Sequence, residues 1–333
     1  MFLNKTKIIA RLEEHKKKLI EAGYDEDRML GIFLYGSQNY DMATEESDVD
    51  SIVIYLPTFE DFCLNKEWVS KEYKTKENEH ILLKDIRHMR EMWMKQNCNF
   101  LEILFTEYCI LNPKYENLFQ YYFIDNREDI AHYDRQKAVR SVCGQMKSTL
   151  SKDLTPKKIY NGARLFHLLT EYAAGKPYAE CIKPRGTMHN YLWDIKYGEE
   201  EFEMDWINEQ AEILRNNFTF LEDVLVPTLD SPRQEAANAA LIKGVCEILK
   251  LSFTEEAITR QDFKKLLTAT ESKAFKTIID EIGNEGNISL SQMVKKYSIS
   301  RPVYDNLLSK MKEYHLAEVI PQGVKGTYVK FRR

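Results

Sequence analysis

The chain has no apolar run that approaches the ~20 residues that a membrane-spanning helix needs. Its first residues carry no apolar core of the signal-peptide kind, so we expect a cytoplasmic protein with no membrane partner. The six cysteines are scattered, form no Cys-x-x-Cys pair and have no nearby histidine partner. We therefore expect neither a zinc site nor a disulfide framework, but reduced thiols in a cytoplasm.

Charge is unevenly distributed, although the 333 residues carry a net charge of only −5. Residues 284–333 hold nine Lys or Arg and four Asp or Glu, a local excess of +5. Because nucleic-acid affinity depends largely on neutralising phosphates, this excess predicts a nucleic-acid partner for the C-terminal part of the chain. With 44% apolar residues, the chain is also long enough for two or three small domains with their own cores.

Two aspartates lie between short apolar segments in the first part of the chain. Residues 31–35 read Gly-Ile-Phe-Leu-Tyr and residues 51–55 read Ser-Ile-Val-Ile-Tyr, and both predict buried strands. Asp48 and Asp50 precede the second strand, and side chains two apart on a strand share a face. Two such anions are costly unless a cation lies between them, and hard oxygen ligands suit Mg²⁺. An isolated Asp-x-Asp is more often ordinary turn chemistry at the start of a strand.

A Gly-Ser turn ends the first strand, with ten residues between it and Asp48, and it favours the metal site over ordinary turn chemistry. Its backbone N–H groups can bind an anion, the second half of a metal-and-phosphate site. In Gly36-Ser-Gln-Asn-Tyr40 and Ser47-Asp-Val-Asp50 the chain resembles the DNA polymerase β-like nucleotidyltransferase superfamily, especially a predicted branch of bacteria and phages. The resemblance implies that Gly36 and Ser37 hold a nucleoside triphosphate, while Asp48 and Asp50 bind two Mg²⁺ or Mn²⁺ ions.

The resemblance also implies a third carboxylate on a neighbouring strand, which would close the metal site and act as general base. Glu79 and Asp85 flank residues 80–84, which read as another strand, and Glu102 lies among apolar residues. Burying an unpaired carboxylate costs several kcal/mol, so Glu102 needs either a catalytic role or structural partners. Glu79 fits the strand topology best, and we rank it first as the catalytic partner of the two aspartates. The choice among the three acids stays open.

A helix is predicted from Pro156, with Thr155 as its N-cap. Lys157 and Arg164 fall on one stripe of this helix, and Lys158 lies beside it. Cations a turn or two apart can contact successive phosphates of a triphosphate. The resemblance implies that a helix after the catalytic sheet supplies such residues. We assign Lys157 or Lys158, together with Arg164, to nucleotide binding; ordinary surface cations are the alternative.

The C-terminal stretch has the order of elements of a winged helix: a helix over 289–297, a second helix from Arg301, and two strands at 316–320 and 327–331. It resembles the DNA-binding domain of the GTP- and branched-chain-amino-acid-responsive pleiotropic repressor of Gram-positive bacteria, most closely in Val324-Lys-Gly-Thr-Tyr-Val-Lys330. The resemblance implies that a recognition helix and a wing contact nucleic acid through Arg301, Tyr304, Asn306, Lys310 and Lys325. A winged helix used for protein contacts or dimerisation is the alternative.

The predicted fold is an α/β (α+β) nucleotidyltransferase domain with a mixed sheet over 1–112, an α-helical domain over 113–253 that closes over the nucleotide, and a connecting helix with a winged helix-turn-helix over 254–333. The expected reaction transfers a nucleoside monophosphate from an NTP such as ATP to a hydroxyl, foremost the 3′ end of RNA, tRNA or DNA, and releases pyrophosphate. A homodimer is compatible with the sequence. The alternatives are a nucleotide-sensing winged-helix transcriptional regulator and a nucleotidyltransferase that modifies a protein partner.

Overall fold

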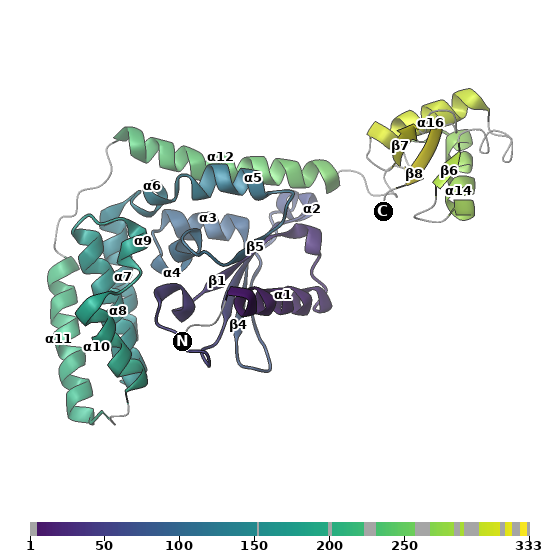
Figure 1. Ribbon diagram of the computed structural model, residues 1–333. Helices are drawn as coiled ribbons and strands as arrows, with labels where there is room; N and C mark the ends of the chain where they lie inside the picture. The colour runs from purple at the N-terminus through teal and green to yellow at the C-terminus, as the bar shows by residue number, and fades with distance from the viewer. Residues whose placement is uncertain are drawn as a thin grey trace. The chain divides into compact units, whose positions relative to one another are not determined.

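The computed structural model of the chain describes residues 5–151, 153–198, 202–222, 231–256, 267–282, 287–289, 300–313, 317–321 and 327–331. The chain divides into two compact units, Met1–Phe253 and Thr254–Arg333 (Figure 1). The first unit contains a mixed sheet with helices on both faces and a group of long helices. The second contains a small sheet and two described helices.

The sheet of the first unit has five strands in the order β3-β4-β2-β1-β5. β2 runs parallel to β4 and the other neighbouring pairs are antiparallel, so the α/β architecture with a mixed sheet is confirmed. The two apolar segments around the Gly-Ser turn form β1 and β2, as predicted. The strand bounds are Met29–Tyr35 (β1), Asp50–Tyr55 (β2), Ser70–Lys74 (β3), His80–Asp85 (β4) and Cys109–Leu111 (β5).

Alternate residues of the central strands pack on opposite faces of this sheet. Helix α1 (Lys5–Glu21) covers one face, where its Leu12 joins a core with Val53 and Ile81. Ile52 packs on the other face, in the larger core that continues into the helices. Residue parity along β2 and β4 therefore decides whether a side chain faces α1 or the helical side.

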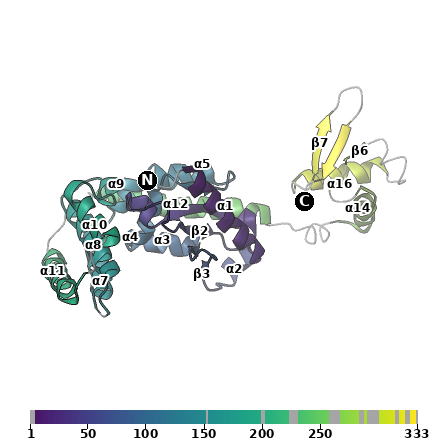
Figure 2. The same cartoon turned by 60° about the horizontal axis from the view of Figure 1, so that its bottom comes forward.

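Short helices and turns connect α1 and the strands and lead to the long helices. They are η1 (Glu26–Arg28), η2 (Ser37–Tyr40), α2 (Phe59–Cys63), α3 (Ile86–Met94), α4 (Cys98–Leu101), η3 (Glu102–Leu104), α5 (Glu116–Phe119), η4 (Gln120–Ile124) and α6 (Arg127–Ala131). The long helices α7 (Arg135–Thr149), α8 (Pro156–Ala173), α10 (Gly186–Tyr197) and α11 (Met204–Glu222) lie side by side (Figures 1 and 2), with α9 (Tyr178–Cys181) at one end. Helix α12 (Ser231–Glu256) follows, and its residues up to Phe253 belong to this unit.

Helix α8 begins as the sequence predicts, because Thr155 Oγ1 accepts the backbone N–H of Lys158 at 3.3 Å and Pro156 is its first residue. Gly162 lets α8 approach its neighbours closely. A Cβ at that position would lie 3.0 Å from Leu214 on α11 and 3.1 Å from Met146 on α7. These two helices therefore fix α8 from one side, and its opposite side is left to face the sheet.

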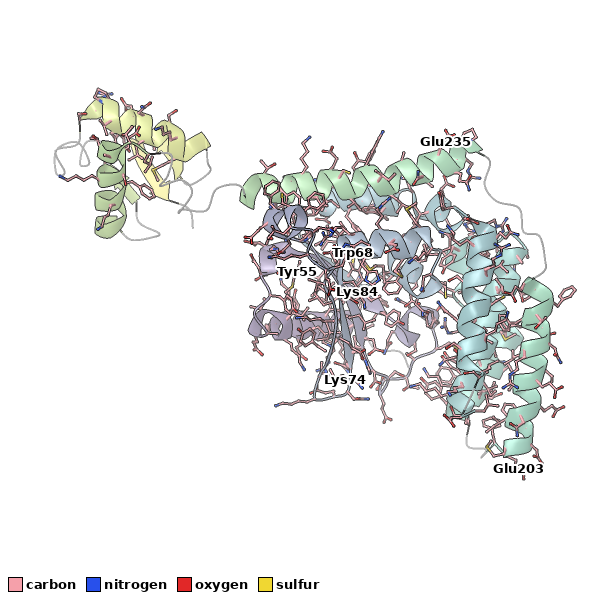
Figure 3. The ribbon with its side chains drawn as sticks, turned by 180° about the vertical axis from the view of Figure 1, so that it is seen from behind. Tyr55, Trp68, Lys74, Lys84, Glu203 and Glu235 are labelled. Atoms are coloured by element: carbon pink, nitrogen blue, oxygen red, sulfur yellow. The ribbon has the colours of Figure 1, made fainter. Side chains whose placement is uncertain are left out.

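The site described below lies at the end of the sheet that is far from α12. Figure 3 shows Tyr55, the last residue of β2, near α12, and Lys74, the last residue of β3, at the opposite end. Lys74 pairs with His80, the first residue of β4, and β4 runs parallel to β2. The start of β2, with Asp50, therefore lies at the Lys74 end.

The second unit holds an antiparallel sheet in the order β6-β8-β7, formed by Asn287–Ser289 (β6), Ala317–Pro321 (β7) and Thr327–Phe331 (β8). Its described helices are α14 (Ala269–Ile282) and α16 (Arg301–Glu313). The second helix and the two strands of the predicted winged helix are present. Its first helix falls outside the described residues, apart from Ser289, which ends β6. The winged helix therefore stays a prediction.

Candidate active site

The Gly-Ser turn and the first residue of β2 are direct neighbours. Tyr35, at the end of β1, pairs with Asp50 in the antiparallel ladder, so the turn begins beside the Asp50 side chain. Gly36 has a φ of 92°, a conformation that favours glycine, and a Cβ there would lie 3.5 Å from Asp50 Oδ2. The turn therefore needs glycine for its backbone conformation, and Ser37 follows it into η2.

Asp50 is an under-compensated carboxylate. Its Oδ1 accepts the backbone N–H of His80 at 2.8 Å. Burial raises the pKa of the Asp50 carboxyl, and the nearby negative charge of Asp48 raises it further. Within the described part of the chain, neither aspartate forms an ion pair with a cationic side chain. This is the electrostatic state expected of carboxylates that await a cation.

These residues open into a cavity of about 1120 Å³ that reaches from the end of the sheet to α8 and α10. The cavity brings Gly36, Ser37, Asp48 and Asp50 together with Lys157 and Arg164, which lie more than 100 positions later in the sequence. The remaining lining residues are Tyr35, Tyr40, Thr44, Glu45, Glu46, Ser47, Pro156, Tyr160, Asn161, Ile195, Lys196 and Tyr197. Lys158 does not line it. One wall is therefore acidic and the facing wall is basic.

Arg164 is the buried cation of the basic wall. It is 9% exposed, and its guanidinium carbon lies 4.2 Å from the centre of the Tyr40 ring. No hydrogen bond or ion pair to Arg164 occurs among the residues that the structure describes. The charges of Arg164 and Glu102 attract each other, but without a hydrogen bond the guanidinium keeps its N–H donors for an anion in the cavity. Lys157, on the same stripe of α8 as Arg164, is exposed and also lines the cavity.

Glu79, ranked first as the third carboxylate, is not brought to the cavity. Glu79 lies two positions before Ile81 and therefore on the same face of the sheet, the one that α1 covers. There it accepts a hydrogen bond from Arg11 Nε at 3.1 Å and contacts His15 Nε2 at 3.0 Å. Burial raises the pKa of the Glu79 carboxyl, but the hydrogen bonds from Arg11 and His15 outweigh burial and hold the pKa below its ordinary value. This geometry does not support a base at Glu79, because its oxygens bind Arg11 and His15 on the opposite face from Asp50, and the third carboxylate stays a prediction.

The His15 ring also contacts Ser51 Oγ at 2.9 Å through Nδ1, which gives a Ser-His-Glu series across α1, β2 and β4. His15 and Ser51 are fully buried, so no substrate can reach this serine. The series is a structural polar network that joins α1 to the start of β2.

Asp85 and Glu102, the other candidates, do not line the cavity either. Asp85 caps α3, where its Oδ1 accepts the backbone N–H of Arg87 at 2.8 Å. Glu102 is 2% exposed and accepts the backbone N–H of Gly36 at 2.9 Å and the hydroxyl of Tyr40. Burial raises the pKa of the Glu102 carboxyl to about 7. Glu102 thus supports the Gly-Ser turn from behind, and it occupies the Gly36 N–H that the sequence suggested for an anion.

Two carboxylates remain for a metal. Within the described ranges, no three His, Cys, Asp or Glu side chains are grouped so as to hold a metal ion. Mg²⁺ needs only one or two protein carboxylates when phosphate oxygens and water complete its shell. Asp48 and Asp50 therefore fit Mg²⁺ that is bound together with a triphosphate, and they do not fit a preformed, all-protein metal site.

Helix α10 contributes residues that no sequence motif indicated. Lys196 and Tyr197 line the cavity, and Tyr197 Oη lies 3.0 Å from Ser47 Oγ, the residue before Asp48. The two partners are separated by 150 positions, so neither spacing nor composition could reveal the pairing.

The residues assigned to nucleic acid on α16 differ in exposure: Tyr304 is buried, Lys310 is half-buried, and Asn306 is exposed. Tyr304 is 1% exposed, and Asn306 and Lys310 contact Glu271 of α14 at 3.3 and 2.8 Å. The assignment of Tyr304 to a recognition surface is wrong, because its side chain belongs to the core of the unit. Arg301 is exposed, and Lys325 lies outside the described residues.

No protein-family model matches the chain. Among solved structures, the chain is similar to a nucleotidyltransferase-like protein from Exiguobacterium sibiricum 255-15. The two chains are 14% identical, and the match covers 96% of this chain and 99% of that chain with a TM-score of 0.23. An identity and a TM-score this low establish neither family membership nor function, so any assignment rests on the residues of the site.

No helix in the described ranges has the length and apolar content to cross a membrane.

Proposed function

We propose that this protein is a metal-dependent nucleotidyltransferase that uses a nucleoside triphosphate. The observation that carries the proposal is the cavity in which Asp48 and Asp50 face the unpaired guanidinium of Arg164 across the Gly-Ser turn. A triphosphate is a polyanion, and with Mg²⁺ it offers positive charge to the aspartates and negative charge to the arginine. A cavity of about 1120 Å³ has room for a nucleotide and part of a second substrate.

In this proposal the residues act mainly by positioning and by neutralising charge. Arg164 and Lys157 bind phosphate oxygens, and Ser37 binds at the turn. Asp48 and Asp50 hold Mg²⁺, which when bound supplies charge for the acceptor oxygen and the leaving group. The acceptor oxygen bonds to the α-phosphorus, the bond from that phosphorus to pyrophosphate breaks, and the hydroxyl proton passes to water.

The acceptor that the site favours is a hydroxyl of a protein or a small molecule. The argument for a nucleic-acid end came from the C-terminal basic excess and from α16, where Tyr304 is buried and Asn306 and Lys310 contact Glu271 of their own unit. Glu45 and Glu46 are exposed in the cavity lining and would repel a polyanionic strand. Transfer to RNA or DNA is the outcome that would overturn this choice of acceptor.

The experiment supplies each α-labelled NTP with Mg²⁺ to the full chain in the presence of a cell extract, total RNA or DNA. Wild type is compared with Asp50→Asn, and with Asp205→Asn as the matched control, since Asp205 is an exposed aspartate of α11 outside the cavity. Label that wild type and Asp205→Asn transfer, but Asp50→Asn does not, supports the enzyme and identifies the acceptor class. Nucleotide binding without transfer in any mixture would overturn the enzyme and favour the nucleotide-sensing regulator.

A further inference from the structure

The segment between the Gly-Ser turn and the aspartates, residues 41–47, is held by the helical side of the unit. Lys183 Nζ lies 3.6 Å from Asp41 Oδ2, and His189 Nε2 lies 3.2 Å from the Asp41 carbonyl oxygen. Lys196 Nζ donates to the Met42 carbonyl at 2.8 Å. All three side chains come from α10 or the turn before it, so this helix contacts the segment at several points.

Tyr197 makes the contact nearest to the metal-binding residues. Its hydroxyl donates to the Met42 carbonyl at 3.0 Å, which leaves it to accept from the hydroxyl of Ser47 at 3.0 Å. Ser47 Oγ in turn accepts the backbone N–H of Thr44 at 2.8 Å. The Tyr197 hydroxyl therefore joins both ends of the segment, at Met42 and at Ser47.

The Asp48 side chain is not held in place by contacts of its own among the described residues. Its side chain is exposed, and within the described part of the chain it forms no hydrogen bond or ion pair. Its position is therefore set by the residues on either side of it. Val49 N–H donates to Glu79 Oε1 at 3.3 Å on one side, and Ser47 contacts Tyr197 on the other.

We propose that Tyr197 is a positioning residue: through Ser47 and Met42 it fixes segment 41–47 and, with it, the position of the adjoining Asp48 at the cavity. The inference rests on the proposed function for its effect on metal binding. Its effect on the segment itself depends only on the contacts above. Because Tyr197 also lines the cavity, a ligand bound against α10 contacts the same residue that orders Asp48.

Tyr197→Phe removes only the hydroxyl. Tyr191→Phe is the matched control, because Tyr191 lies on the same helix and its hydroxyl bonds Gln210 of α11 at 2.9 Å. Amide deuterium exchange of residues 42–49 is measured in the full-length wild type and in both variants without ligand. The loss of the hydrogen bonds to Met42 and Ser47 predicts exchange that is at least about 2–10-fold faster in Tyr197→Phe and unchanged in the control.

The second readout is the Mg²⁺ concentration for half-maximal transfer, measured with saturating NTP. Tyr197→Phe is expected to raise it about 2–10-fold, while the KM for NTP changes much less. Ser47→Ala should give the same result, and the double variant should add little to either single change. A structural role alone would lower the melting temperature and leave this Mg²⁺ dependence unchanged.

The two proposals fail differently. Unchanged amide exchange in Tyr197→Phe overturns the positioning role, whatever the enzyme does. Faster exchange in Tyr197→Phe with an unchanged Mg²⁺ dependence also overturns it, because the segment would then not govern Asp48. A wild-type protein without any transfer overturns the proposed function, and the exchange data still decide whether Tyr197 holds the segment.

Discussion

The backbone N–H of Gly36 donates to Glu102 Oε1 at 2.9 Å, which places a buried carboxylate directly behind the turn that faces the cavity. The other oxygen of Glu102 accepts the hydroxyl of Tyr40, whose ring lies against Arg164. One carboxylate thus supports both the turn beside Asp50 and the aromatic ring that lies against Arg164.

Glu102→Gln tests the cost of this burial. Burial raises the pKa of Glu102 from 4.5 to about 7, so the folded state binds the proton more tightly than the unfolded state. Its contribution to stability is complete below pH 4.5 and is lost as the pH rises toward about 7. The free energy of unfolding of Glu102→Gln should therefore rise relative to wild type across this window, by up to about 3 kcal/mol. Denaturant unfolding at pH 4.5, 5.5 and 7.5 measures the change; a difference that is constant with pH would contradict it.

Asp50→Asn should stabilise the apoprotein while it abolishes transfer. Burial raises the pKa of Asp50, so its ionised form costs stability at neutral pH, and the amide removes that cost. We expect a gain of about 0.5–2 kcal/mol in the free energy of unfolding of the first unit at pH 7 without Mg²⁺.

When Mg²⁺ and NTP are bound, wild type should become more stable than Asp50→Asn. Wild type should gain about 2.7 kcal/mol when Mg²⁺ and NTP are present at 100 times the dissociation constant, and Asp50→Asn should gain much less. Asp205→Asn, the exposed control, should behave as wild type in both conditions. Equal ligand stabilisation of Asp50→Asn and wild type would show that Asp50 does not hold the metal.

Arg164→Met tests the basic wall. Loss of a charge-assisted contact to phosphate should raise the NTP dissociation constant about 10–100-fold. The matched control is Arg140→Met, since Arg140 is exposed on α7 and does not line the cavity. Calorimetric titration of a non-hydrolysable NTP with Mg²⁺ measures both. An unchanged affinity in Arg164→Met would remove the anion site from this wall.

Glu79→Gln should affect stability more than chemistry. Hydrogen bonds from Arg11 and His15 outweigh burial and hold the pKa of Glu79 below its ordinary value, so the folded state favours the ionised form. Its contribution is present above the unfolded-state pKa and is lost as the pH falls through the folded-state pKa.

We therefore expect Glu79→Gln to lower the free energy of unfolding by about 1–3 kcal/mol at pH 7 and by less at acidic pH. The folded variant should keep its pH–rate profile, as measured by initial transfer rates from pH 6 to 9. Disappearance of a limb of that profile would restore Glu79 as a base.

The sequence already determined the central strands and the residues of the acidic wall. The apolar content of 31–35 and 51–55 predicts β1 and β2, and the two-residue spacing of Asp48 and Asp50 limits them to one face. The sequence also indicated that Tyr304 is buried, although the winged-helix resemblance assigned it to the nucleic-acid surface. Tyr304 lies three and four positions before Leu307 and Leu308, on the apolar stripe of α16, and all three are buried.

The tertiary structure alone decided which face of the sheet each acid occupies and what lies opposite. Periodicity gives the alternation along β4, but only the packing of α1 shows that Glu79 belongs to its face and not to that of Asp50. The pairing of Ser47 with Tyr197, 150 positions away, depends on how α10 packs on α8. Local sequence carries no record of that packing, because contacts between distant segments arise from burial of complementary surfaces and not from residue spacing.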